Sequence, residues 1–343
     1  MTIAITGAAG HLGGNLVRAL AQRGENVRAV VHHDKRALEG LDVEVVSADV
    51  TDLASIRAAL QGASVIYHLA AVISIDGDHG GRVTRVNVQG SANVAEVALE
   101  LGVRMVHVSS IHAMQQRPLD QPLDETRARV PWDDKRWPAY DRSKAEGERV
   151  VRRAIDRGLD ATIIHPTGVI GGHDYGPSRL GKVFVDLYHR RLPSVVDGGF
   201  DWVDVRDVID AMQAAADPTK GRCGESYLLT GHWRSVIELA RVAERITGKA
   251  PPRFHSPLWL AHIGAPFMTA WARMVGAEPL YTLESLEALQ SNRDMRSEKA
   301  QADLGFRSRP FDQSVYDIYQ WHRSVGNIPR DAELRPPADD TST

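Results

Sequence analysis

The stretch Thr6-Gly7-Ala8-Ala9-Gly10-His11-Leu12-Gly13 stands between an apolar run, residues 3–6, and a segment with helical periodicity, residues 11–23. In a strand–turn–helix unit the first glycine permits a tight turn, the second lets the backbone approach a pyrophosphate, and the third lets helix and strand pack closely. The helix N-terminus adds free N–H groups and a positive dipole end. This stretch therefore predicts a dinucleotide site, with a purely structural turn as the alternative. The residues expected at the cofactor are Gly7, Gly10, His11, Leu12 and Gly13.

Short β-rich runs and helical periodicity alternate through most of the chain. Strands are predicted at residues 3–6, 27–31, 43–46, 65–69, 103–108, 160–165 and 225–230, and helices at 11–23, 53–60, 87–101, 140–156 and 204–216. Strict alternation predicts parallel β-α-β units, and continuous apolar strands fit a sheet covered on both faces. The predicted fold class is α/β: a doubly wound parallel sheet of the Rossmann type with a smaller, mostly helical, discontinuous substrate lobe.

The change of pattern after residue 166 predicts the domain boundaries. We expect residues 1–166 and 201–231 to form the NAD(P)-binding domain and residues 167–200 and 232–328 to form the lobe. Residues 329–343 are polar and contain several prolines, so we expect a disordered tail.

Composition excludes several classes of protein. The 44 acidic and 41 basic residues give a net charge of −3, and no run of Lys and Arg marks a nucleic-acid interface. Cys223 is the one cysteine, which excludes an internal disulfide and a cysteine-rich zinc site, and we expect no metal. The apolar stretch 254–276 is interrupted by His, Pro and Arg, which predicts packed helices and no membrane span. The first strand begins at once and leaves no room for a signal peptide, so we expect a cytoplasmic enzyme.

The glycine spacing TGxxGxxG resembles that of the extended short-chain dehydrogenase/reductase superfamily, also described as the NAD-dependent epimerase/dehydratase family. Further motifs of the superfamily follow in the expected order: Asp49-Val50, His68-Leu69-Ala70-Ala71, Asn87-Val88-Gln89-Gly90, Val108-Ser109-Ser110, Tyr140-Asp141-Arg142-Ser143-Lys144 and residues 202–208. The resemblance covers residues 1–325 and is closest to dihydroflavonol-4-reductase-like members.

The resemblance implies further cofactor contacts and a homodimer. The implied contact residues are Asp49, Val50, Leu69, Ala70, Ala71, Asn87, His165, Pro166 and Thr167, the last three holding the nicotinamide carboxamide through their backbone. Locally, Asn87 could equally be a helix N-cap, because asparagine favours that position. A dimer would form through helices of the nucleotide-binding domain.

The end of the second predicted strand is where such a fold distinguishes NAD from NADP. An acidic residue there would bond the ribose 2′-hydroxyl and select NAD, whereas a basic residue would accept the 2′-phosphate of NADP. The sequence offers His32 at that position, with Lys35 and Arg36 nearby. The expected cofactor is NADP or NAD, with NADP favoured. Two alternatives stay open: Asp34 could reach back to the hydroxyl, or the loop could ignore the 2′ position.

Tyr140 and Lys144 are four residues apart on a predicted helix, so they project from one face. The phenol has an ordinary pKa of about 10, and an ammonium group nearby could lower that pKa by about 1–3. Tyr140 would then give a proton to a carbonyl oxygen, or take one from an alcohol, as hydride moves. The resemblance implies that Lys144 also bonds the nicotinamide ribose. Ser110 ends a predicted strand and completes a catalytic set that orients the substrate oxygen.

The residues around this set have ordinary interpretations. We expect His107 and His112 to be hydrogen-bonded structural groups. Trp132 and Trp137 either line the substrate pocket or simply pack.

Three functions are compatible with these motifs. The first is an NAD(P)-dependent oxidoreductase that reduces a ketone or aldehyde, or oxidises the secondary alcohol, using a small-molecule substrate. The second is an NAD-retaining sugar or nucleotide-sugar epimerase or dehydratase. Sugar-nucleotide members usually carry an arginine in the segment that corresponds to residues 197–202, which has none here, so the first function is favoured. The third, a cofactor-sensing regulator, is disfavoured because such proteins lose the Tyr–Lys pair.

Overall fold

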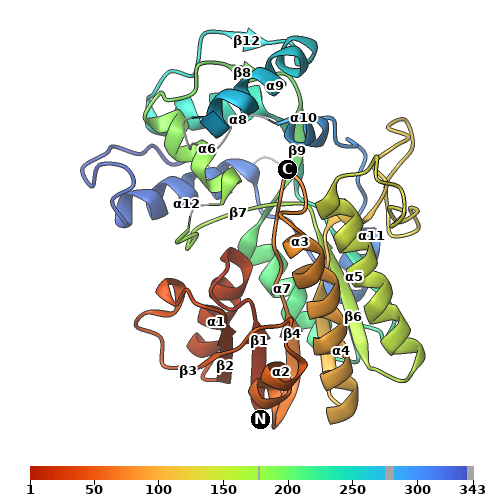
Figure 1. Ribbon diagram of the computed structural model, residues 1–343. Helices are drawn as coiled ribbons and strands as arrows, with labels where there is room; N and C mark the ends of the chain where they lie inside the picture. The colour runs from red at the N-terminus through yellow and green to blue at the C-terminus, as the bar shows by residue number, and fades with distance from the viewer. Residues whose placement is uncertain (177, 275–281, 338–343) are drawn as a thin grey trace.

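The computed structural model describes residues 1–176, 178–274 and 282–337. Within these residues seven strands form one parallel sheet (Figure 1). In spatial order they are β10 (Ser226–Leu229), β6 (Ala161–Pro166), β5 (Arg104–Val108), β4 (Ala63–His68), β1 (Thr2–Thr6), β2 (Asn26–Val31) and β3 (Glu44–Ser47). The strand order reverses between β1 and β4, and ligands of doubly wound sheets bind at such a point, beyond the carboxyl ends of the strands.

Helices cover both faces of the sheet, as the continuous apolar strands predict. They are α2 (Leu53–Leu60), α4 (Gly90–Leu101) and α5 (Ala139–Asp156) on one face, and α1 (His11–Gln22), α7 (Val205–Ala216) and α11 (Glu298–Leu304) on the other. β5 shows the arrangement: Met105 belongs to the core with Val94 and Val151, whereas its neighbour Val106 belongs to the core with Leu16 and Met212. The predicted fold class is confirmed.

The glycine turn between β1 and α1 has the geometry that its sequence predicts. Gly7 has a φ of +70°, and a Cβ there would lie 2.6 Å from the backbone nitrogen of Ala70. A Cβ on Gly13 would lie 2.1 Å from the carbonyl oxygen of Gly7. Only glycine fits either position, because the turn, the first turn of α1 and the segment after β4 are pressed together.

The second part of the molecule lies beyond the carboxyl ends of the strands, at the top of Figure 1. Its elements are β7 (Gly168–Ile170), α6 (Arg179–Tyr188), β8 (Val195–Val196), β9 (Gly199–Asp204), β11 (His232–Ser235), α8 (Val236–Thr247), β12 (His255–Ser256), α9 (Leu258–Met274), α10 (Leu283–Ala288) and α12 (Phe311–Ser324). β11, β9 and β7 form a small sheet, and β12 pairs with β8. Phe184, Leu239 and Tyr319 lie in a core of their own, which makes this part a separate packing unit.

The packing differs from the predicted boundaries in two places. Ala300, Leu304 and Phe306 lie in the core of the large sheet, so residues 298–306 pack on the nucleotide-binding domain, outside the lobe to which the sequence assigns them. Residues 329–337, predicted to be disordered, are ordered: Leu334 packs on the lobe core, and the backbone nitrogen of Arg335 donates to Ile246 O at 2.8 Å. The apolar side chain of Leu334 and one backbone hydrogen bond thus hold this polar segment against α8. In the described part of the chain every helix is too short or too polar to span a bilayer.

Candidate active site

The structure brings Ser110, Tyr140 and Lys144 together at the carboxyl edge of the sheet. Ser110 follows β5, where its hydroxyl accepts from His112 N at 3.2 Å and lies near enough to the phenol of Tyr140 on α5 to lower the pKa of that phenol. One turn further along α5, Lys144 is 6% exposed and donates from Nζ to the carbonyl oxygen of Val108 at 2.8 Å. The three side chains therefore meet where the strand ends and the helix begins, as the spacing in the sequence predicts.

The protonation of Tyr140 differs from the expectation. Burial raises the pKa of the phenol to about 12, the Ser110 hydrogen bond lowers it in part, and the charge of Asp141 raises it further. Burial likewise lowers the pKa of Lys144 to about 8, with Glu148 opposing. The predicted lowering of the tyrosine pKa is therefore wrong for this structure, because burial of the phenol dominates and raises its pKa. The phenol carries its proton at neutral pH.

A histidine and a carboxylate stand next to the phenol. His112 Nδ1 lies 3.0 Å from Asp141 Oδ1, and its ring packs edge-on against Tyr140 with centroids 5.4 Å apart. Partial burial alone would lower the pKa of His112, but the Asp141 carboxylate outweighs it and the pKa is raised. The sequence predicted a hydrogen-bonded histidine here but missed Asp141 as its partner. The signal available was the position of Asp141 directly after the tyrosine.

Asn87 holds the segment after β4 against α5. Its side-chain oxygen accepts from Val72 N at 2.8 Å, and its amide nitrogen donates to Val72 O at 3.0 Å and to Ser143 Oγ at 2.9 Å. Asn87 lies inside a π-helical turn, residues 85–89, so it is not an N-cap. Gly147 allows this contact, because a Cβ there would lie 2.6 Å from Asn87 O. The asparagine thus fixes the distance between two segments of the site.

Two neutral histidines, His68 of β4 and His107 of β5, form a layer in the sheet. His68 Nδ1 is 2.7 Å from Thr6 Oγ1, and its Nε2 is 3.1 Å from Ser91 Oγ. His107 stacks on His68 with centroids 5.4 Å apart, and neither of its buried ring nitrogens has a hydrogen-bond partner among the described residues. The predicted hydrogen-bonded role is therefore wrong for His107. Burial lowers the pKa of both rings, that of His68 to about 3, so the layer carries no charge.

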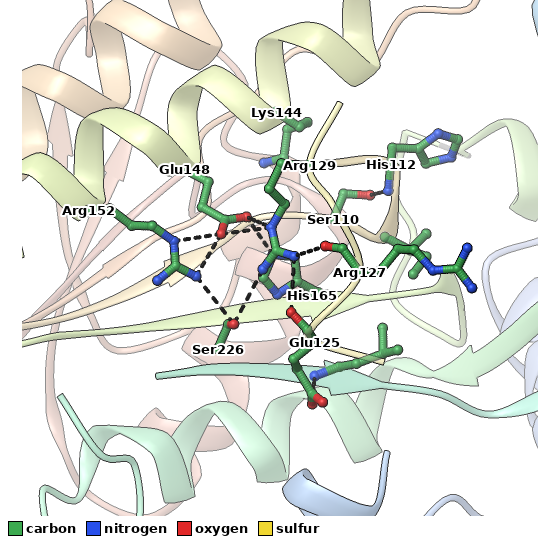
Figure 2. Close-up of polar contacts among 12 residues, drawn as sticks. Ser110, His112, Glu125, Arg127, Arg129, Lys144, Glu148, Arg152, His165 and Ser226 are labelled. Atoms are coloured by element: carbon green, nitrogen blue, oxygen red, sulfur yellow. Dashed lines mark hydrogen bonds and ion pairs between the residues drawn. The ribbon is translucent and has the colours of Figure 1, made fainter. Parts of the chain in front are cut away.

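A buried ionic network, centred on Glu148, begins one turn beyond Lys144. Figure 2 shows its carboxylate between two guanidinium groups and the ring of His165. Arg129 Nε lies 2.9 Å from Glu148 Oε1, Arg152 Nε lies 2.8 Å from the same oxygen, and His165 Nε2 lies 2.7 Å from Oε2. Arg129 also donates to the carbonyl oxygens of Glu125 and Arg127 at 3.1 and 2.7 Å. The network therefore ties the loop before the catalytic helix to that helix and to β6.

The charge state of the network follows from its partners. Burial alone would raise the pKa of Glu148, but His165, Arg129 and Arg152 reverse this and hold the pKa well below its ordinary value. Burial lowers the pKa of His165, with Glu148 opposing. We conclude that Glu148 is ionised and paired chiefly with the two arginines. Sequence reasoning missed this residue, although its place four residues after Lys144 put it on the same helix face.

The predicted cofactor residues surround the point where the strand order reverses. His11 Nε2 lies 3.1 Å from Gly172 O, which ties the first turn of α1 to the loop after β7. Leu69 N donates to Thr6 O at 3.2 Å, which keeps residues 69–71 beside the glycine turn. The turn and the start of α1 contain Gly7, Gly10, Leu12 and Gly13. Val50 lies shortly after the end of β3. The tight turn, the free helix end and the adjacent segment fit a dinucleotide pyrophosphate.

The residues expected to read the cofactor ribose lie on one exposed edge. His32 Nε2 is 3.8 Å from Asp49 Oδ2, and the rings of His32 and His33 contact each other at a tilt of 51°, with centroids 3.7 Å apart. Arg36 binds both oxygens of Asp34, with Nε–Oδ1 at 3.0 Å and Nη2–Oδ2 at 2.7 Å. The carboxylate of Asp34 is therefore already engaged, which weakens the alternative that it reaches back to a ribose hydroxyl.

At the end of β6 the side chains turn away from the cofactor edge. His165 is committed to Glu148, and Thr167 Oγ1 donates to Asp201 Oδ1 at 2.6 Å. Any contact of these positions with a cofactor would therefore come from the backbone, as the resemblance implies. Among the residues that the structure describes, no group of three or more His, Cys, Asp or Glu side chains could hold a metal ion.

Comparison with known proteins gives three findings. The model of the NAD dependent epimerase/dehydratase family matches residues 3–229. The chain is 36% identical over 336 residues, 96% of its length, to the whole of sterol demethylase protein B of Methylococcus capsulatus. It is 28% identical over 327 residues to a 4-hydroxy-2-methyl-3-oxo-4-farnesyl-3,4-dihydroquinoline-1-oxide ketoreductase of Stigmatella aurantiaca, covering 91% of this chain and 94% of that one.

The fold is also similar to solved structures. The crystal structure of gox2253 superposes with a TM-score of 0.82 at 29% identity, covering 95% of this chain and 99% of the other. These similarities agree with the order of motifs along the sequence.

Proposed function

The chain belongs to the NAD dependent epimerase/dehydratase family, within the extended short-chain dehydrogenases/reductases, and from this membership we propose that it is an NAD(P)-dependent oxidoreductase that reduces a ketone or aldehyde. The observation that carries the proposal is the meeting of Ser110, Tyr140 and Lys144 at the carboxyl edge of the sheet, next to the glycine turn. The cofactor supplies or accepts the hydride when it is bound. The reverse reaction would oxidise the corresponding secondary alcohol.

The protein's own groups supply the proton and the orientation. Tyr140 is the proton donor, because its raised pKa keeps the phenol protonated until negative charge grows on a carbonyl oxygen. Ser110 lies beside that phenol and orients the same carbonyl oxygen. Lys144 presents its amine beside the strand end, where it can bond a ribose hydroxyl of the cofactor.

Three observations support reduction over sugar epimerisation. The segment 197–202 has no arginine, and Phe200 instead packs edge-on against Trp202 with ring centroids 5.3 Å apart. An aromatic segment without a cation suits an apolar substrate better than a nucleotide diphosphate. A phenol held in its protonated form suits a general acid. The two similar proteins are named for a sterol and for a farnesylated quinoline oxide, both of which are large apolar molecules.

Cofactor retention tests the proposal. A reductase exchanges its cofactor in every cycle, so the purified protein should release little nucleotide when denatured and should consume added NADPH in the presence of bulky aromatic or aliphatic ketones. An epimerase keeps its cofactor between two half-reactions. The measurements are the absorbance of the supernatant after denaturation and the loss of NADPH absorbance. Tightly held NAD, no consumption with any ketone and interconversion of a sugar nucleotide would assign the alternative, an NAD-retaining sugar epimerase.

Cofactor preference gives a second prediction. NADPH should bind more tightly than NADH, because no acid occupies the His32 position and Lys35 and Arg36 lie beside it. Replacing both Lys35 and Arg36 with Ala should reduce the ratio of the NADPH and NADH affinities about tenfold or more, since a charge-assisted hydrogen bond contributes about 1.5–3 kcal/mol. Fluorescence titration with both cofactors measures this.

The matched control for this prediction is Arg136→Ala. Arg136 binds both oxygens of Asp134 in the same way that Arg36 binds Asp34, but on an exposed loop away from β2. It should leave the preference unchanged. Equal affinity of the wild type for the two cofactors would show that this edge does not read the phosphate.

A further inference from the structure

Large apolar side chains are exposed together at the far end of the lobe. Phe254 is 75% exposed, Trp259 65%, Ile263 59% and Leu260 47%. Phe254 directly precedes β12, and the other three lie in the first half of α9; we call the four residues together the apolar face of α9. α9 lies at the top of Figure 1, on the side of the lobe remote from the strands of the large sheet.

The first half of α9, residues 258–266, exposes more large apolar side chains than it buries. This half rests on the lobe through Leu258, Ala261 and Ala265, of which Ala265 is 1% exposed, and all three pack on a cluster that includes Leu286 and Leu289. Helices of globular proteins normally bury their largest apolar side chains and expose small or polar ones. α9 instead exposes tryptophan, leucine and isoleucine. Since contiguous exposed apolar patches mark interaction sites, this face is built to be covered.

The segments next to the apolar face carry an excess of positive charge. Arg190 and Arg191 follow α6, and Lys249 and Arg253 precede β12; all four are exposed. The two segments are joined, because Val195 N donates to Phe254 O at 3.1 Å, and Lys249 Nζ lies 5.3 Å from the centroid of the Tyr188 ring. Their acids are Asp186, 3.9 Å from Arg191, and the exposed Asp197. The cations therefore surround one side of the apolar face and outnumber the acids.

We propose that the apolar face of α9 docks onto a lipid bilayer that contains anionic lipids. An apolar helix face flanked by basic residues lies in the interface with its side chains at the boundary of headgroups and acyl chains. Tryptophan suits that depth, because its ring has an apolar body and a polar N–H. The arginines and the lysine contact the headgroups, whose negative surface potential attracts them.

α10 connects α9 to the segment beside the candidate active site. α10 packs on α9, and Thr282 at its start donates from Oγ1 to Ile75 O at 2.8 Å. Ile75 belongs to the segment that follows β4 at the carboxyl edge of the sheet. The helix that would contact the bilayer, α9, is thus connected to the site through α10.

Vesicle sedimentation of the full chain tests the proposal. We expect the protein to bind vesicles of equal parts phosphatidylcholine and phosphatidylglycerol, to bind phosphatidylcholine alone far more weakly, and to be released by raised salt. Trp259→Ser with Ile263→Ser should weaken binding about tenfold or more, because two apolar side chains lose their burial. Arg190→Glu with Arg191→Glu should weaken it about fivefold or more for each charge removed.

Two control substitutions elsewhere on the surface test whether the effects are specific to the apolar face of α9. Val325→Ser changes an exposed apolar residue, 41% exposed, at the end of α12, and Arg153→Glu changes an exposed arginine on α5. Both should bind vesicles like the wild type. Circular dichroism should show that the variants fold, as expected for exposed positions. Because no substrate or cofactor is present, the result is independent of the proposed reaction.

Two results would overturn the proposal. One is vesicle binding that is absent in the wild type or unchanged in both double variants. The other is a stable dimer in light scattering that Trp259→Ser dissociates without any vesicle binding, which would assign the face to a second copy of the chain.

Discussion

Tyr140→Phe is expected to reduce the turnover of the ketone by about 10²–10⁴-fold, the usual contribution of a positioned general acid. The substitution removes only the hydroxyl, whose proton is retained because burial raises the pKa of the phenol to about 12. Fold and cofactor affinity should change little, since the ring remains. The measurements are the rate of NADPH loss with a ketone that the wild type reduces, and cofactor affinity by fluorescence titration.

A tyrosine elsewhere provides the control. Tyr316→Phe removes one hydroxyl from α12, in the lobe core and away from the candidate site. It should retain the wild-type rate. Wild-type turnover in Tyr140→Phe would show that another group donates the proton, with His112 the nearest titratable candidate.

Glu148→Ala is expected to destabilise the protein by about 3–5 kcal/mol, the usual effect of removing one partner of a buried ion pair. Glu148 is 1% exposed and bonds Arg129, Arg152 and His165, so its loss leaves two guanidinium groups without a buried counter-charge. The midpoint of urea unfolding should fall with little change in slope.

Glu146→Ala is the matched control on the same helix. Glu146 pairs with Arg149 and Arg153 nearer the surface, so its loss should cost about 0–1 kcal/mol. Equal effects of the two substitutions would contradict the role given to the buried network.

The pH dependence of stability follows from the lowered pKa of Glu148. In the unfolded chain this carboxyl titrates near 4.3, whereas in the folded protein its pKa lies lower. The unfolded state therefore takes up the proton first as the pH falls, and the stabilisation is full above about 4.3 and is lost below it. The difference in unfolding free energy between wild type and Glu148→Ala should shrink over that range. The pKa of His165 is also lowered, so the unfolded state takes up a proton on this ring more readily than the folded state below about pH 6.5. This histidine therefore adds to the loss of stability as the pH falls.

Local sequence was sufficient to predict the sheet and the glycine turn and to select the three proposed catalytic residues. The glycine turn depends on residues within one strand–turn–helix unit, and its φ and close contacts follow from the lack of Cβ atoms at Gly7 and Gly13. Tyr140 and Lys144 share a helix face by spacing alone. The residues that interact in these two features are either close in the chain or lie at the ends of strands, which the strand order of the fold brings together.

Tertiary structure decided the charge states and the surfaces. Glu148 meets Arg129 and His165 only after the loop, helix and strand that carry them have packed, so no local pattern marks the network. The pKa of Tyr140 depends on burial by surrounding elements, which reversed the direction expected from Lys144. The apolar stretch after residue 254 was predicted to pack as helices, but only the packing shows which side of α9 is covered. Sequence spacing determines which side chains share a face, whereas desolvation and long-range pairing depend on what the rest of the chain places against that face.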